Sequence, residues 1–243
     1  MRGETRFSDY ISFLQDLDRA QKPYFLEGGQ AVNFWAEYCS ARDGGELQKF
    51  QPFTSDDCDI WISRAAQEYL EQKQSGSLVK GTSPADGQLG VIKLGGNPPR
   101  KIDLLTNVFG IPPNQYERLV QRSLTVNDVT VIDPLNLFLS KCHCLLELDQ
   151  TSRQDEKHLR MLCLILPSYL SSLIEEIKGG ETTERDFIKD IKRLRKICQT
   201  NKCRRALLQI EVPAQSLIPA SEMLQCELPL LEQFAKTQLQ ESA

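Results

Sequence analysis

The chain has 243 residues, of which 40% are hydrophobic and 26% charged, a composition typical of a folded protein rather than a disordered one. Its formal net charge of -4 gives no global positive field, which argues against binding to nucleic acids or membranes through overall charge alone. No apolar run approaches the roughly 18 residues of a membrane span. Residues 1 to 6 lack the apolar stretch of a secretory signal, so we expect a cytoplasmic protein with no membrane partner.

The first half of the chain alternates helical and strand patterns. Apolar residues recur at helical spacing in residues 7 to 21, 30 to 42 and 64 to 73. Short strands are predicted at residues 24 to 26, 58 to 62, 90 to 94 and 101 to 105, with a further strand or hairpin at 125 to 132. Residues 40 to 53 are expected to form an inserted loop. These elements predict a small mixed sheet with flanking helices.

From Pro134 onward the pattern is helical throughout. The predicted helices cover residues 134 to 149, 153 to 177, 183 to 199 and 222 to 240. The sequence therefore predicts an α+β fold, with an α/β core over residues 1 to 133 and a helical domain over residues 134 to 243.

The eight cysteines include no pair with CxxC spacing. The cluster Cys142-His143-Cys144 lies in a predicted helix, where neighbouring side chains point in different directions and do not converge on one ion. We therefore expect buried, reduced thiols. Both His143 and His158 are expected to be packing or surface groups.

Gly28 and Gly29 follow the strand predicted at residues 24 to 26 and open the next helix. Glycines let the backbone approach a ligand closely, and the free N–H groups at a helix N-terminus bind phosphate oxygens. The same pair is also typical of a plain turn.

Asp57 and Asp59 are two residues apart at the start of a predicted strand, so their side chains project from the same face. Two adjacent carboxylates repel each other, and oxygen ligands at this spacing suit Mg²⁺ completed by substrate phosphates. The alternative is that the two acids are solvated charges at the start of a strand and bind no metal. Asp103 lies within the apolar strand pattern of residues 101 to 105, where an acid is either an exposed edge residue or directed into a site.

The order of these motifs resembles the nucleotidyltransferase superfamily over residues 24 to 105. The resemblance implies a nucleotidyltransferase core in which Gly28 and Gly29 contact the triphosphate of ATP or another NTP. It implies that the catalytic residues Asp57, Asp59 and Asp103 hold Mg²⁺, with two ions expected, and that Asp103 helps to activate the attacking hydroxyl. The implied reaction is in-line attack on the α-phosphate, with pyrophosphate leaving.

The chain departs from the family pattern in two places. The segment between Gly29 and Asp57 is longer than in compact members, and the second glycine of the pair stands where Ser is commoner. Both departures leave room for an inactive homologue, whereas retention of the three carboxylates argues for activity.

The helices that follow resemble the abortive-infection (AbiE toxin type) nucleotidyltransferases. Lys141 lies on the first helix after the core, and Arg153-Gln154-Asp155 begins the next. The resemblance implies that Lys141 contacts phosphate oxygens and that Arg153 or Asp155 lies nearby, so Lys141 and Arg153 join Gly28 and Gly29 as nucleotide-binding residues. The alternative is that Lys141 and Arg153 are solvated helix charges.

The acceptor is less clearly specified than the donor. Residues 189 to 205 are rich in Lys and Arg, and a basic helix beside an acidic core suits an RNA backbone. RNA, tRNA in particular, is the first acceptor expected, in a toxin–antitoxin or phage-defence setting with an antitoxin or other regulatory chain as partner. One alternative is an aminoglycoside-type small molecule, for which acids such as Glu147 and Asp149 would bind the cationic acceptor. The other is a catalytically inactive binding subunit that keeps the fold.

Overall fold

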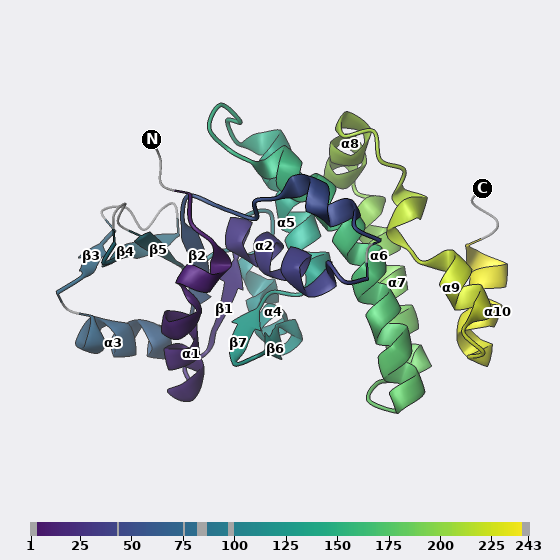
Figure 1. Ribbon diagram of the computed structural model, residues 1–243, viewed down its shortest axis with the longest axis horizontal. Coiled ribbons are helices and arrows are strands. Elements are labelled where there is room, and N and C mark those ends of the chain that lie inside the picture. The colour runs from purple at the N-terminus through teal and green to yellow at the C-terminus, as the bar shows by residue number, and fades with distance from the viewer. Residues whose placement is uncertain (1–3, 43, 75, 82–86, 97–99, 240–243) are drawn as a thin grey trace.

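The computed structural model, which describes residues 4–42, 44–74, 76–81, 87–96 and 100–239, has a mixed sheet followed by a helical C-terminal part (Figure 1). This arrangement confirms the predicted α+β fold class. The described residues form one seven-stranded sheet in the order β3-β4-β5-β2-β1-β7-β6, larger than the small sheet predicted. Its strands are β1 (Tyr24–Glu27), β2 (Cys58–Ile62), β3 (Leu78–Lys80), β4 (Gln88–Leu94), β5 (Arg100–Leu105), β6 (Leu124–Val126) and β7 (Val129–Val131).

The middle of the sheet combines parallel and antiparallel pairs. Strand β2 runs antiparallel to β1 and parallel to β5. In this register Glu27 lies opposite Asp59, and Asp59 lies opposite Asp103. Because residues directly opposite each other on neighbouring strands project from the same face, strand pairing aligns three acids across the centre of the sheet.

Helix α2 connects the sheet to the helical half. The helices are α1 (Ile11–Arg19), α2 (Gly28–Cys39), α3 (Arg64–Lys73), α4 (Tyr116–Arg122), α5 (Pro134–Glu147), α6 (Asp155–Gly179), α7 (Glu184–Cys198), α8 (Asn201–Gln209), α9 (Ala220–Gln225) and α10 (Pro229–Gln238). Helix α2 packs against β1 and β2 on one side and against α5 and α6 on the other. The buried indole of Trp35 donates a hydrogen bond of 2.9 Å to the carbonyl of Ile132, just before α5. The sheet and the helices therefore share one continuous core.

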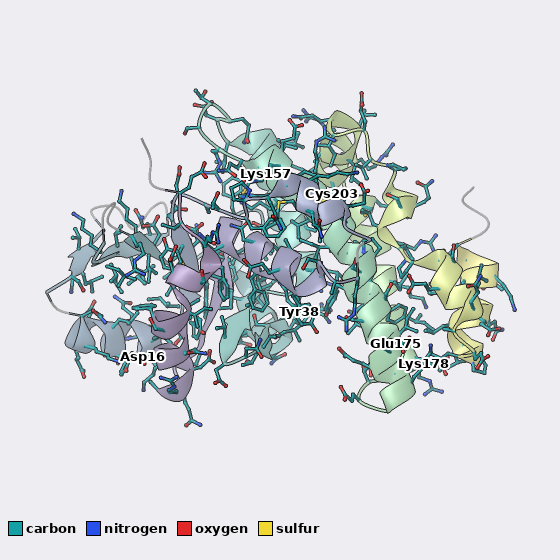
Figure 2. The ribbon with its side chains drawn as sticks, viewed as in Figure 1. Asp16, Tyr38, Lys157, Glu175, Lys178 and Cys203 are labelled. Atoms are coloured by element: carbon teal, nitrogen blue, oxygen red, sulfur yellow. The ribbon has the colours of Figure 1, made fainter. Side chains whose placement is uncertain are left out.

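The long helix α6 lies between the sheet and helices α9 and α10 (Figure 1). Figure 2 shows Lys157 near the end where α5 and α8 lie, and Glu175 and Lys178 near the opposite end. All eight cysteines are buried, as expected, and five of them lie on α5, α6, α7 and α8, where these helices pack together. The start of α6 is thus the part of this helix that lies near the sheet.

The structure differs from the sequence prediction at several short elements. The helix predicted over residues 222 to 240 is two helices, α9 and α10, because Pro229 lacks a backbone N–H and begins a helix rather than continuing one. Strand β3 and helices α4 and α8 were not predicted. The loop expected at residues 40 to 53 contains a 3₁₀ helix at Glu46–Phe50, which buries Leu47.

None of the helices in the described part of the chain combines the length and the apolar character that crossing a membrane requires. The division into two domains at residue 133 stays a prediction.

A buried polar network surrounds the start of α5. The carboxylate of Asp133 accepts hydrogen bonds from the backbone N–H groups of Leu135 at 3.1 Å and Asn136 at 3.2 Å, so it is the N-cap of α5. Arg193 of α7 lies 3.5 Å from the same carboxylate, and Arg122 of α4 lies 3.9 Å from it. One side chain therefore ties three helices together.

We expect Asp133→Ala to lower the free energy of unfolding by about 2–4 kcal/mol, because it removes a helix cap and leaves two arginines short of a buried partner. Asp133→Asn is the matched variant, since Asn also caps helices well but carries no charge. Chemical denaturation should rank the wild type above Asp133→Asn and Asp133→Asn above Asp133→Ala. Equal stability of all three proteins would show that the network contributes nothing.

Candidate functional site

Three carboxylates converge where β2 and β5 pair. One oxygen each from Asp57, Asp59 and Asp103 lies within 4.8 Å of the other two. Asp59 and Asp103 are direct partners on parallel strands, and Asp57 precedes Asp59 by two residues. Within the described ranges, this is the one group of three or more potential metal ligands that meets this spacing. The structure thus brings together the three acids predicted to hold a metal.

The carboxylate trio lines a cleft of about 380 Å³, which residues at the start of α6 also border. All seven residues predicted for the site border this cleft: Gly28, Gly29, Asp57, Asp59, Asp103, Lys141 and Arg153. Asp56 borders it as well. The motifs found separately in the sequence therefore form one site.

The two glycines are required by close approach of other residues. Gly28 has φ +67°, and a Cβ atom there would lie 2.0 Å from Oδ2 of Asp59. At Gly29 a Cβ atom would lie 2.5 Å from the hydroxyl oxygen of Ser55 and 2.9 Å from Cε1 of His158. The second position of the pair thus has no room for the side chain of a serine.

For the carboxylates of the trio, burial and mutual repulsion outweigh the positive charges nearby among the described residues. Burial raises the pKa of Asp59 to about 8, with further contributions from the charges of Asp57 and Asp103. Burial and the charge of Asp57 raise the pKa of Asp103 to about 6. The pKa of Asp57 is also raised, by burial and by Asp56. Three crowded oxygen donors with unbalanced charge fit a hard divalent cation.

Cations occupy the opposite wall of the cleft. Lys141 of α5 is buried, and its Nζ donates a hydrogen bond of 2.8 Å to Asp155 at the start of α6. Nε of Arg153 donates to the same carboxylate at 2.5 Å. Burial alone would raise the pKa of Asp155, but the two cations hold it well below its usual range. Burial would likewise lower the pKa of Lys141, yet the neighbouring Cys144 and Asp155 keep it raised.

These contacts exclude the alternative that Lys141 is a solvated helix charge. Lys141 is only 4% exposed. The side chain of Arg153, which pairs with the same carboxylate of Asp155, is 40% exposed. One carboxylate shared between two cations leaves a net positive charge on this wall.

Among the residues of the cleft that were not predicted, three share one feature. Glu27 at the end of β1, Gln154 before α6 and His158 in its first turn all border the cleft, and each has a buried polar atom without a hydrogen-bond partner among the described residues. His158 was expected to be a packing or surface group. Its spacing of three residues from Asp155, which places both on one face of a helix, is the signal that indicates its position.

No protein-family model matches the chain, and no curated protein matches it. Among solved structures, the chain is similar to the crystal structure of an antigenic nucleotidyltransferase-like protein from Paracoccidioides brasiliensis. The two share 12% sequence identity with a TM-score of 0.43, over 79% of this chain and 95% of that one. A TM-score this low does not establish a common fold, so the assignment of the site rests on its geometry.

We expect Gly28→Ala to weaken binding of Mg²⁺ or Mn²⁺ by at least about tenfold, since the added methyl group would displace the carboxylate of Asp59. Gly180→Ala is the matched control, because Gly180 has a similar φ of +80° but nothing within 4 Å of its Cβ position. Both variants carry the same backbone strain, about 1 kcal/mol. Isothermal titration calorimetry should detect the loss of cation affinity in Gly28→Ala alone, and an equal loss in both variants would contradict this explanation.

We expect Asp59→Asn to stabilise the metal-free protein by about 1–3 kcal/mol at pH 8, because it removes a buried charge without changing side-chain size. Because the folded-state pKa is raised from 3.8 to about 8, the native state binds more protons than the unfolded chain between these values. The stability of the wild type in a chelator should therefore fall as the pH rises through this window, and that of Asp59→Asn should fall less.

Denaturation at pH 5 and pH 8 in a chelator tests this expectation. Asp186→Asn is the control, because a hydrogen bond from Lys189 lowers the pKa of this exposed carboxyl, so its replacement should not stabilise the protein. A wild type that is equally stable at both pH values would show that Asp59 is not strained in the metal-free state.

Proposed function

We propose that the protein is a metal-dependent nucleotidyltransferase that moves a nucleoside monophosphate from an NTP to an acceptor. The observation that supports this best is the composition of a single cleft. A trio of carboxylates faces two cations, and the N-terminus of α2 opens between them. A cation site, an anion site and free backbone N–H groups together match a metal–triphosphate complex.

Asp57, Asp59 and Asp103 would hold Mg²⁺, with two ions as the expected number. Bound there, Mg²⁺ would neutralise the trio and stabilise negative charge on the entering and leaving oxygens. The raised pKa values of Asp59 and Asp103 support this assignment, because they mark carboxylates whose charge the described part of the chain does not fully neutralise.

The chain's own groups would orient the triphosphate. The backbone N–H groups of Gly28 and Gly29 begin α2, where they have no partner within the helix and are free for phosphate oxygens. Lys141 and Arg153 would balance the phosphate charge from the opposite wall, and Asp155 holds both in place. Asp103 would accept the proton of the attacking hydroxyl group.

For the acceptor we propose RNA, with tRNA as the first candidate. Arg204 and Arg205 are exposed on α8, which packs against α5, the helix that carries Lys141. Lys202 of α8 pairs with Glu147 at the end of α5. This pairing neutralises an acid that a cationic aminoglycoside would need, so RNA is favoured. Membership of the AbiE toxin type, with an antitoxin as partner, stays a prediction.

We expect incubation with Mg²⁺, total cellular RNA and each α-labelled NTP to label RNA, because the cleft combines a metal–triphosphate site with a basic neighbouring surface. Asp57→Asn and Asp59→Asn should each reduce labelling by at least about 10³-fold, since each removes a metal ligand at the reacting phosphate. Gel electrophoresis followed by autoradiography measures the transfer.

Folding of each variant is checked by thermal unfolding, which should show no loss of stability. Label on a small molecule or protein but not on RNA would retain the reaction and replace the acceptor. NTP binding without transfer to any acceptor would identify a binding subunit. A wild type that binds no NTP in the presence of Mg²⁺ would overturn the proposal.

A further inference from the structure

A second cavity lies in the helical half of the molecule. Its volume is about 410 Å³, and none of the described residues that border it also borders the cleft with the carboxylate trio. The end of α7, helix α8, the 3₁₀ helix Ala214–Leu217, the start of α9 and the residue after α10 surround it. Figure 1 shows α9 and α10 at the end of the molecule opposite to β3, β4 and β5. Small-molecule sites span roughly 300–1,000 Å³, so this cavity is large enough to hold a ligand of its own.

The walls of this cavity are aliphatic. Four apolar side chains border it, and each is only half-buried by the described part of the chain: Ala214, Ile218, Ala220 and Leu239. The buried thiol of Cys198 borders it as well. No aromatic side chain is among the described residues that border the cavity, so the walls offer no stacking surface for a nucleobase. They suit the aliphatic body of a ligand, whose burial here would remove apolar surface from water on both sides.

Two guanidinium groups border the same cavity. Arg195 lies in the last turn of α7 and is half-buried, and Arg204 is exposed on α8. Neither side chain makes an ion pair or a hydrogen bond with another residue in the part of the chain that the structure describes. The described residues around the cavity include no Asp or Glu, so its polar groups carry positive charge alone. A guanidinium group presents a planar set of N–H donors that matches a carboxylate.

We propose that this cavity binds a small amphipathic carboxylate, with its aliphatic body against Ile218 and Leu239 and its carboxylate held by Arg195 and Arg204. A neutral apolar ligand would leave both guanidinium groups without a partner. A small hydrophilic anion would leave the aliphatic walls exposed to water. A ligand that carries both parts satisfies both, and the inference does not depend on the proposed nucleotidyl transfer. Arg204 also belongs to the surface proposed for RNA, so the experiment has to separate the two ligands.

The test uses octanoate as the probe for the whole protein in a chelator, with 1-octanol as its uncharged counterpart. We expect isothermal titration calorimetry to show octanoate binding at least about tenfold more tightly than octanol. Replacing both arginines, Arg195→Gln with Arg204→Gln, should remove that preference and change octanol binding by less than about twofold. Arg205→Gln is the matched control, because Arg205 is the exposed neighbour of Arg204 on α8 but does not border the cavity. It should leave octanoate binding within about twofold of the wild type.

Ala220→Leu is the second variant, and it tests the apolar wall without altering any charge. The larger side chain would fill part of the cavity, so we expect it to weaken octanoate and octanol binding alike, with thermal unfolding as the check on folding. Asp59→Asn should bind octanoate as the wild type does, because the trio takes no part in this site. Loss of NTP binding in that variant therefore leaves the present inference untouched.

Three results would overturn this inference. The first is a wild type that binds octanoate no more tightly than octanol. The second is an equal loss of octanoate binding in the double variant and in Arg205→Gln, which would indicate surface charge and not a site. The third is binding of total cellular RNA or of phosphatidylglycerol vesicles that requires Arg195 and Arg204 in a protein that binds no free octanoate, which would assign these arginines to a phosphate-bearing partner instead.

Discussion

Repulsion among acids in the middle of the sheet is the constraint on which the rest of this structure depends. Pairing of β1, β2 and β5 puts Glu27, Asp59 and Asp103 side by side, and Asp57 joins them from the preceding turn. Burial makes each charge costly, and burial together with the charge of Asp59 raises the pKa of Glu27 far above its usual range. A sheet selected for stability alone would place apolar residues at these positions. The cost is therefore best explained by a ligand that removes it.

The cationic wall depends on how the helical half is held against the sheet. Lys141 lies two turns into α5, whose start is fixed by Asp133 and, through it, by α4 and α7. Helix α2 fills the space between the sheet and α6 with a fully buried set of side chains that includes Trp35. Both walls of the cleft depend on this packing of α2, α5 and α6 against the sheet. The packing that stabilises the protein therefore also sets the separation between the carboxylates and Lys141.

Local patterns predicted most of the elements and singled out Gly28, Gly29, Asp57 and Asp59, because each of these signals is encoded within a few positions. Strand periodicity places Asp57 and Asp59 on one face, and a glycine pair after a strand indicates a helix start. Local patterns do not specify the register between strands that are distant in the sequence. They also do not specify which face of a helix packs against another helix. Glu27 became a neighbour of Asp59 through strand pairing, and His158 reached Gly29 through the packing of α6 on α2. Both escaped prediction for that reason.

The glycine at position 29 is required by close packing at the start of α2. A serine there would collide with the hydroxyl group of Ser55, so the two side chains compete for one place. In this chain the hydroxyl group beside the start of α2 belongs to Ser55, in the segment before β2, rather than to the helix itself. What a phosphate would meet is the set of donors, not the residue that carries each of them. Close packing thus accounts for the glycine at position 29, and Ser55 places a hydroxyl group beside the start of α2.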